Sequence, residues 1–150
     1  MKDVVRYLLA VVLSVAIFST ANAQVRKIPA AVTEAFKDKY PNASNVEWKD
    51  KLTSFQATFD LDNEKYEAKF NKKGEWQNTE NEIEDNDLPQ AVSDGRSKSK
   101  YADWEIDHMY KIELPNDKVQ YRIEVSKSDL QKKNLLFNSE GRLLKDKITL

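Results

Sequence analysis

The side chains that most often carry enzyme chemistry are scarce in this chain. It has no cysteine and a single histidine, His108, among its 150 residues. A histidine that acts as a general base needs a nucleophile or a water within hydrogen-bond reach and a carboxylate that orients its ring. The chain contains no G-x-S-x-G motif, and the alternation of residues places His108 with Trp104, Ile106 and Tyr110 on an apolar strand face. We therefore expect a packed, hydrogen-bonded histidine and no catalytic residues.

Carboxylates are abundant, so metal binding has to be considered separately. Residues 60–64 alternate oxygen ligands as a calcium loop does, but Lys65 and Asn71 stand where an EF-hand has its glycine and its last glutamate. We interpret this segment as a strand end and a turn, and we predict no metal ligands and no cofactor. The alternative is a weakly held divalent ion, for which an exported module needs only millimolar affinity, at an acidic segment that contains Glu80, Glu82, Glu84, Asp85 and Asp87.

The overall composition excludes several other classes of function. Charged residues make up 33% of the chain, but their signs are mixed and the formal net charge is -1. Nucleic-acid binding would require a basic stripe with stacking aromatic side chains. The sequence shows no such stripe, because its basic and acidic residues interleave. The absence of cysteine excludes a disulfide framework, so stability has to come from packed apolar surface.

The N-terminal residues have the pattern of an export signal. A short charged start is followed by an apolar run, residues 7–18, and then by Ala21-Asn22-Ala23, which is typical of a cleavage site. The run is too short to cross a bilayer, where roughly 20 apolar residues are needed. We predict a signal peptide at residues 1–23 and a periplasmic, monomeric protein that does not contact the membrane after cleavage. Secretion beyond the periplasm is the alternative.

The rest of the chain contains two copies of one pattern. Ile28–Val32 (IPAAV) resembles Leu88–Val92 (LPQAV), and Phe70–Gly74 (FNKKG) resembles Phe137–Gly141 (FNSEG), in the same order. We infer an internal duplication, with repeat 1 at residues 24–83 and repeat 2 at residues 84–150. The two copies should form one compact unit, because each alone would bury too little apolar surface.

Each copy has the periodicity of one helix followed by four strands. In repeat 1, residues 28–40 have helical spacing, and three alternating segments and a fourth extended one follow. Repeat 2 starts with a weaker helix, because Gly95 stands where repeat 1 has Ala35, and continues with a long alternating face at residues 104–114. Residues 79–87 are polar and acidic and should form a joint. The predicted fold is α+β, one continuous antiparallel sheet of about eight strands with both helices on its apolar face.

These motifs resemble those of the periplasmic PepSY-like, or β-lactamase-inhibitor-protein-like, family. The family pattern has a [IL]-P-x-A-V helix start, a Tyr-Pro helix end and an F-x-x-x-G hairpin. Repeat 1 has all three, with Tyr40-Pro41 at its helix end, whereas repeat 2 has Tyr101-Ala102 there. The resemblance covers residues 28–150 and implies tandem units of a helix and a four-stranded sheet. It also implies binding, since the inhibitor that names the family holds an enzyme across a concave sheet surface, but it specifies no partner.

The polar face of the predicted sheet is the best candidate for binding. We predict an exported, non-enzymatic module that binds an unknown periplasmic protein or peptide, in an inhibitor-like manner, through this face or through the groove between the repeats. A periplasmic sensor of a small ligand or divalent ion is the alternative, and an ordinary solvated sheet surface would have the same interleaved charges. The predicted face consists of Gln56, Thr58, Lys65, Glu67, Lys69, Asp107, Met109, Lys111, Gln120, Arg122 and Glu124.

Overall fold

The computed structural model describes residues 27–148, and the predicted signal peptide lies outside them. The predicted α+β fold is confirmed, because all eight strands form one antiparallel sheet in sequence order, β1 to β8. Neither helix in this described part has the length and apolar character needed to cross a membrane. The elements are α2 (Ala30–Lys39), β1 (Ser44–Asp50), β2 (Ser54–Leu61), β3 (Glu64–Asn71), β4 (Trp76–Glu82), η1 (Asp85–Asp87), α3 (Gln90–Ser97), β5 (Glu105–Leu114), β6 (Lys118–Ser128), β7 (Gln131–Asn138) and β8 (Leu143–Ile148).

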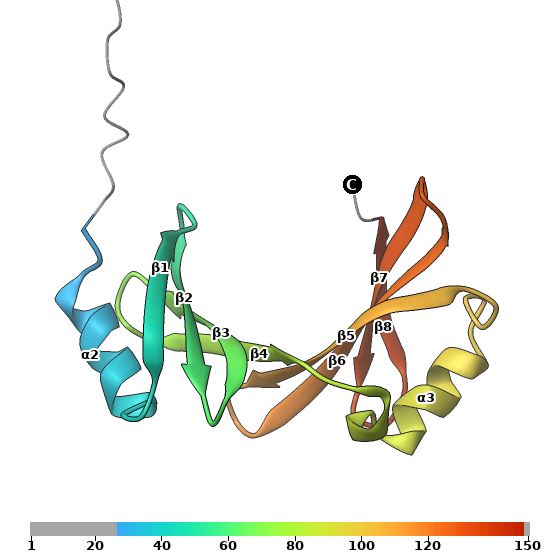
Figure 1. The fold of residues 1–150 in the computed structure, drawn as a ribbon, viewed down its shortest axis with the longest axis horizontal. Helices are drawn as coiled ribbons and strands as arrows, with labels where there is room; N and C mark the ends of the chain where they lie inside the picture. The colour runs from blue at the N-terminus through green and yellow to red at the C-terminus, as the bar shows by residue number, and fades with distance from the viewer. Residues whose placement is uncertain (1–26, 149–150) are drawn as a thin grey trace, which may run out of the picture.

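The sheet is bent into a trough, with both helices on its outer side (Figure 1). Helix α2 lies outside the strands of the first half, and α3 lies outside those of the second half. We call the helix-covered side the convex face and the opposite side the concave face. The concave face is therefore open across the whole width of the sheet.

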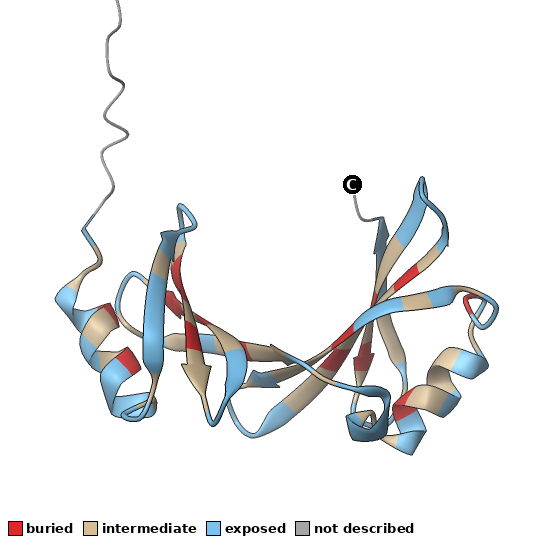
Figure 2. Cartoon of the chain, viewed as in Figure 1, coloured by how far each residue is buried: buried red, intermediate tan, exposed pale blue. Residues whose placement is uncertain are grey.

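The apolar side chains form two separate clusters, one in each half (Figure 2). In the first cluster, the ring of Phe36 on α2 meets those of Phe59 and Trp48 edge-on, with centroids 5.0 and 5.3 Å apart. In the second cluster, Val92 on α3 packs with residues such as Ile123, both fully buried. Burying aromatic and branched side chains in this way is the main stabilising contribution of each half.

The repeated hairpin glycines are explained by close contact between each hairpin and its helix. Gly74 and Gly141 both have positive φ values, +85° and +79°. A Cβ atom at Gly74 would lie 2.4 Å from the carbonyl oxygen of Ala31, and one at Gly141 would lie 1.9 Å from that of Ala91. In repeat 2, Gly95 also approaches the backbone of Gly141. The glycine that weakens the second helix is thus the residue that lets the hairpin reach it.

In each half, a tyrosine at the helix end or in the turn just after it contacts the fourth strand of the same half. The Tyr40 hydroxyl hydrogen-bonds the Thr79 hydroxyl on β4, and the Tyr101 hydroxyl donates to the Asp146 carboxylate on β8. Tyr101 keeps this contact although the residue after it is alanine rather than proline. The two halves therefore share tertiary contacts as well as sequence motifs, as expected of a duplication.

The acidic segment predicted as a joint is partly a central strand. Its first residues, Thr79–Glu82, belong to β4 and pair with β5 from Glu113 to Tyr110. This ladder joins the two halves into one sheet. The segment was predicted as a joint because every residue in it except Ile83 is polar, a pattern that a strand with one apolar face does not show.

Candidate functional site

Most of the predicted binding residues do lie on the concave face. Antiparallel partners point to the same side of a sheet, and the ladder between β2 and β3 pairs Gln56 with Lys69 and Thr58 with Glu67, out of phase with the buried Ala57. The other predicted residues on this face are Lys65, Asp107, Gln120, Arg122 and Glu124.

Two predicted residues, Met109 and Lys111, lie on the convex face, so this part of the prediction is wrong. The ladder between β5 and β6 shifts register at Asp107, between Ile106 and His108. Such a bulge inserts one residue and reverses the facing of everything beyond it. Met109 consequently pairs with the buried Ile123 and joins the second apolar cluster.

The same bulge places His108 on the concave face, contrary to the prediction of a packed histidine on an apolar face. Its side chain is 52% exposed, and its Nδ1 atom lies 2.7 Å from Oε1 of Glu82 on β4. This hydrogen bond is the main cause that raises the pKa of His108 above its usual value, against an opposing effect of burial. The pair joins the last strand of one half to the first strand of the other.

The centre of the concave face is organised around Arg122. Its guanidinium carbon lies 4.1 Å from the ring centroid of Tyr110, which is a cation–π distance. Its nitrogens lie 3.4 Å from a Glu80 oxygen and 4.0 Å from a Glu124 oxygen. Because Glu80 and Arg122 are mostly covered, the stack and the two carboxylates hold the guanidinium in one place.

Sequence reasoning missed four residues at this centre: Glu80, Glu82, His108 and Tyr110. The two glutamates were assigned to the joint, and the other two follow the bulge and were assigned to the apolar face. A usable signal was present, because Glu80 and Glu82 share a strand parity, which is typical of neighbours on one sheet face. Only the pairing of β4 with β5 brings them next to the second half.

Two exposed leucines lie at the tips of hairpins that form the opposite walls of the trough. Leu52, between β1 and β2, is 76% exposed, and Leu130, between β6 and β7, is 94% exposed. Figure 1 shows both hairpins rising on the open side of the trough. Neither leucine contributes to an apolar cluster, so both are available for contact with another molecule.

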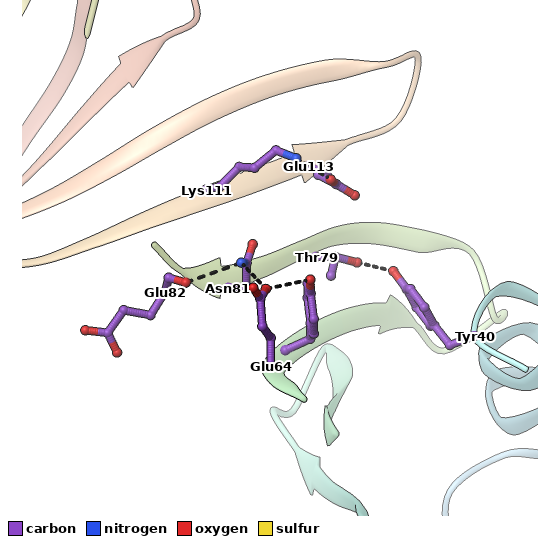
Figure 3. A network of polar contacts seen from close by, with 8 residues as sticks. Tyr40, Glu64, Thr79, Asn81, Glu82, Lys111 and Glu113 are labelled. Atoms are coloured by element: carbon purple, nitrogen blue, oxygen red, sulfur yellow. Dashed lines mark hydrogen bonds and ion pairs between the residues drawn. The ribbon is translucent and has the colours of Figure 1, made fainter. Parts of the chain in front are cut away.

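A groove lies between the halves, and its lining comes from β3 to β6 and η1 and from neither α2 nor α3. Most of the lining side chains are on the convex face, but Lys65 and Glu82 belong to the concave face. Figure 3 shows the polar contacts along it. The Tyr66 hydroxyl donates to Oε2 of Glu64 at 3.0 Å, and the Asn81 amide donates to the same oxygen at 3.3 Å. On the other side, the Lys111 ammonium donates to Oε1 of Glu113 at 2.9 Å. Burial and the nearby carboxylates, Glu64 first, raise the pKa of Tyr66 to about 12.

The structure also bears on metal binding and catalysis. Within residues 27–148, no three histidine, aspartate or glutamate side chains come together as ligands of one metal ion. The acidic segment is divided between β4 and η1, so its carboxylates point in different directions. Among the described residues, His108 hydrogen-bonds a carboxylate but no serine or threonine hydroxyl, which is not the geometry of an activated nucleophile.

A family model matches most of the described chain, at residues 53–145. The family is described as "Putative beta-lactamase-inhibitor-like, PepSY-like". The chain belongs to this PepSY-like family. The match begins just before β2 and ends within β8, so it includes most of the sheet and the whole of α3.

Solved structures of Bacteroides proteins share the PepSY-like fold. A BLIP-like protein from Bacteroides fragilis is 30% identical, with a TM-score of 0.72 over 82% of this chain and 87% of its own. A DUF2874 family protein from Bacteroides ovatus is 26% identical, with a TM-score of 0.75 over 81% and 88%. A structure from Bacteroides eggerthii, described as "putative periplasmic proteins", is 22% identical and shows the fold alone, with a TM-score of 0.74 over 81% and 89%. No curated protein matches the chain.

Membership of the PepSY-like family is consistent with a binding role. The family is described by its likeness to an inhibitor and not by a reaction, and its fold is that of an inhibitor-like binding module. The description assigns no partner to this chain. A partner has to be inferred from the surfaces of the chain itself.

Proposed function

We propose that this PepSY-like chain is an exported, non-enzymatic module that holds a protein or peptide on its concave face. The observation that carries the proposal is the open trough, where one entire face of an eight-stranded sheet is left uncovered by both helices. Its floor has ordered charges around Arg122, and its walls end in Leu52 and Leu130. A polar floor with apolar contacts at two edges suits a folded protein surface better than a small molecule.

Export to the periplasm is part of the same proposal. It is supported by the signal pattern of residues 1–23 and by the description of the Bacteroides eggerthii structure, which shares the fold. The absence of cysteine suits a protein that folds outside the cytoplasm without disulfides. Secretion beyond the periplasm stays the alternative.

The second candidate, a sensor of small ligands or divalent ions, has less support. Its predicted site was the acidic segment, which runs through a strand and a short 3-10 helix in the structure. In the described residues these carboxylates form no shared ligand set. No observation therefore favours ion binding over protein binding.

The test compares two charge reversals on opposite faces of the protein. The concave variant is Lys65→Glu/Lys69→Glu, and the matched control is Lys37→Glu on α2 with Lys98→Glu directly after α3. Neither concave lysine forms an ion pair within the described residues, so both variants should fold, which circular dichroism would check. Parent and variants are immobilised, exposed to periplasmic extract, and any retained protein is identified by mass spectrometry and then purified for direct binding measurements.

We expect the purified partner to bind the concave variant at least about tenfold more weakly than the parent or the control. A further variant, Leu52→Ser/Leu130→Ser, should weaken binding without changing the melting temperature, because both side chains are exposed. Equal binding by the concave variant and the control would contradict the concave face as the site. Retention of no protein by the parent would contradict protein binding itself.

A further inference from the structure

The outer edge of β1 is free in the first half. Within residues 27–148, β1 pairs only with β2, and all its residues except Trp48 are exposed. A groove of about 660 Å³, which we call the edge groove, lies between β1 and α2. Its lining is mainly apolar, with Val46 and Trp48 from β1 and Tyr40 from the end of α2, and none of it belongs to β2. An unpaired strand edge beside an apolar groove can accept an added strand.

The first strand of the second half, β5, occupies the place that corresponds to β1. Trp48 pairs with Ala57 on β2, and Met109 pairs with Ile123 on β6. Each of these two ladders has a register shift just before the pair, between Ser44 and Glu47 in β1 and between Ile106 and His108 in β5. Trp48 and Met109 also pack against the apolar cluster of their own half. The two strands are therefore equivalent, with Met109 in the place of Trp48.

The edge that β1 leaves free is covered in β5 by residues 79–83 of the same chain. Thr79–Glu82 pairs with β5, and the backbone N–H of Ile83 then donates to the carbonyl oxygen of Met109 at 2.9 Å. The side chain of Ile83 packs against the second apolar cluster. The second half thus contains an occupied form of the edge groove. By this equivalence, a strand added to β1 would donate to the carbonyl oxygen of Trp48 and place a branched apolar side chain in the groove.

The charges beside the edge of β1 indicate the chemistry of that strand. Glu82 and Glu80 pair with two positions of β5, Tyr110 and Ile112, whose counterparts in the first half are lysines. Lys49 on β1 and Lys51 directly after it occupy these positions, and both are exposed. Within residues 27–148 neither lysine forms an ion pair. Opposite charges on neighbouring strands stabilise the pairing, so acidic residues are favoured opposite these lysines.

We infer that β1 binds an extended acidic segment of a partner polypeptide as an additional strand, with one branched apolar residue in the edge groove. The acidic part should precede the apolar residue, because Glu47 faces the position that would follow it. A second copy of this chain fits less well, because the other free edge of the sheet, β8, would bring Lys145 and Lys147 next to the lysines of β1. The strand would extend the sheet at its outer edge and leave the concave face open, so this inference goes beyond the proposed function.

The test uses a peptide with the sequence of residues 78–83, NTENEI, acetylated and amidated at its ends. Increasing amounts are added to the ¹⁵N-labelled protein, and the backbone amides are followed by NMR, which gives both the site and the affinity. We expect saturable shifts, confined mainly to β1 and α2, with a Kd below about 1 mM. A peptide N-methylated at its isoleucine amide lacks the donor to the Trp48 carbonyl and should bind at least about fivefold more weakly.

The matched variants reverse two exposed lysines at each free edge of the sheet. Lys49→Glu/Lys51→Glu should weaken binding of the peptide at least about fivefold, whereas Lys145→Glu/Lys147→Glu on β8 should change it less than about twofold. Because all four side chains are exposed, both variants should keep the amide spectrum of a folded protein.

Four results would overturn the inference. The first three are no saturable shifts up to about 1 mM peptide, shifts centred on β8 or on the concave face, and equal weakening in the two lysine variants. The fourth is a concentration-dependent shift of both β1 and β8 without any peptide, which would show that a second copy of the chain occupies the edge groove.

Discussion

At the scale of single residues, one inserted position in β5 decides which side chains lie on the concave face. Asp107 forms the bulge, and its carboxylate accepts a hydrogen bond from the Ser126 hydroxyl at 2.8 Å. Beyond it, His108 and Tyr110 face the trough, whereas Met109 enters the apolar cluster. The composition of the concave face is thus set by the position of the bulge as much as by the residues themselves.

The pair formed by His108 and Glu82 should be visible in a titration. The raised pKa of His108 means that the pair stabilises the fold below the unfolded pKa near 6.5, and that this stability is lost as pH rises through the folded pKa. The effect on stability should be small, because both side chains are more than half exposed. The histidine ring protons, which belong to the only histidine in the chain, should titrate above their usual range by NMR.

Glu82→Gln should bring the midpoint of His108 back toward its usual value, because the charged acceptor is removed. Glu47→Gln, on the far strand of the same face, is the matched control and should leave the midpoint unchanged. An unchanged midpoint in Glu82→Gln would show that the hydrogen bond does not set the pKa.

At the scale of the elements, the likeness of the two halves is best seen in how each helix is held. Each half has a hairpin glycine against its helix backbone and a helix-end tyrosine bonded to its fourth strand. These contacts explain why the shared motifs lie at the helix start and at the hairpin turn. They specify the packing of helix on sheet, and they leave the concave face free to differ between the halves.

Gly141→Ala should destabilise the second half strongly. The new Cβ atom would lie 1.9 Å from the carbonyl oxygen of Ala91, at a φ of +79° that disfavours any side chain. We expect a loss of more than about 2 kcal/mol in the free energy of unfolding, measured by urea titration. Ser139→Ala, at the exposed tip of the same hairpin, is the control and should change it by less than about 0.5 kcal/mol. Similar urea midpoints for the two variants would refute the close contact.

At the scale of the whole molecule, the two halves are joined by backbone and not by a shared core. The ladder between β4 and β5 is continuous with the sheet, but the buried side chains form separate clusters on either side of it. The strip of convex face between the clusters is polar, and Asn81, Lys111 and Glu113 on this strip line the groove between the halves. The same arrangement allows the halves to differ in local stability.

Hydrogen exchange should therefore respond to mutations mainly in the half that is changed. Ile123→Ala should create a cavity in the second cluster, cost about 2–5 kcal/mol, and speed exchange in β6 and β7 more than in β2 and β3. Phe59→Ala, in the first cluster, is the matched variant and should show the opposite pattern. Exchange that rises equally in both halves for both variants would show that the clusters open as one unit.

The sequence by itself determined the elements, their order and the fold, because helical and alternating periodicities are local properties of the chain. The paired motifs at Ile28–Val32 and Leu88–Val92 also predicted the two helix-plus-strand units. The tertiary structure decided which residues share a face after Asp107, because an alternating pattern assigns faces correctly only while the register is unbroken. It also decided that Glu80 and Glu82 lie in a central strand, since strand pairing depends on residues far apart in the chain. The open trough and the groove follow from these non-local pairings.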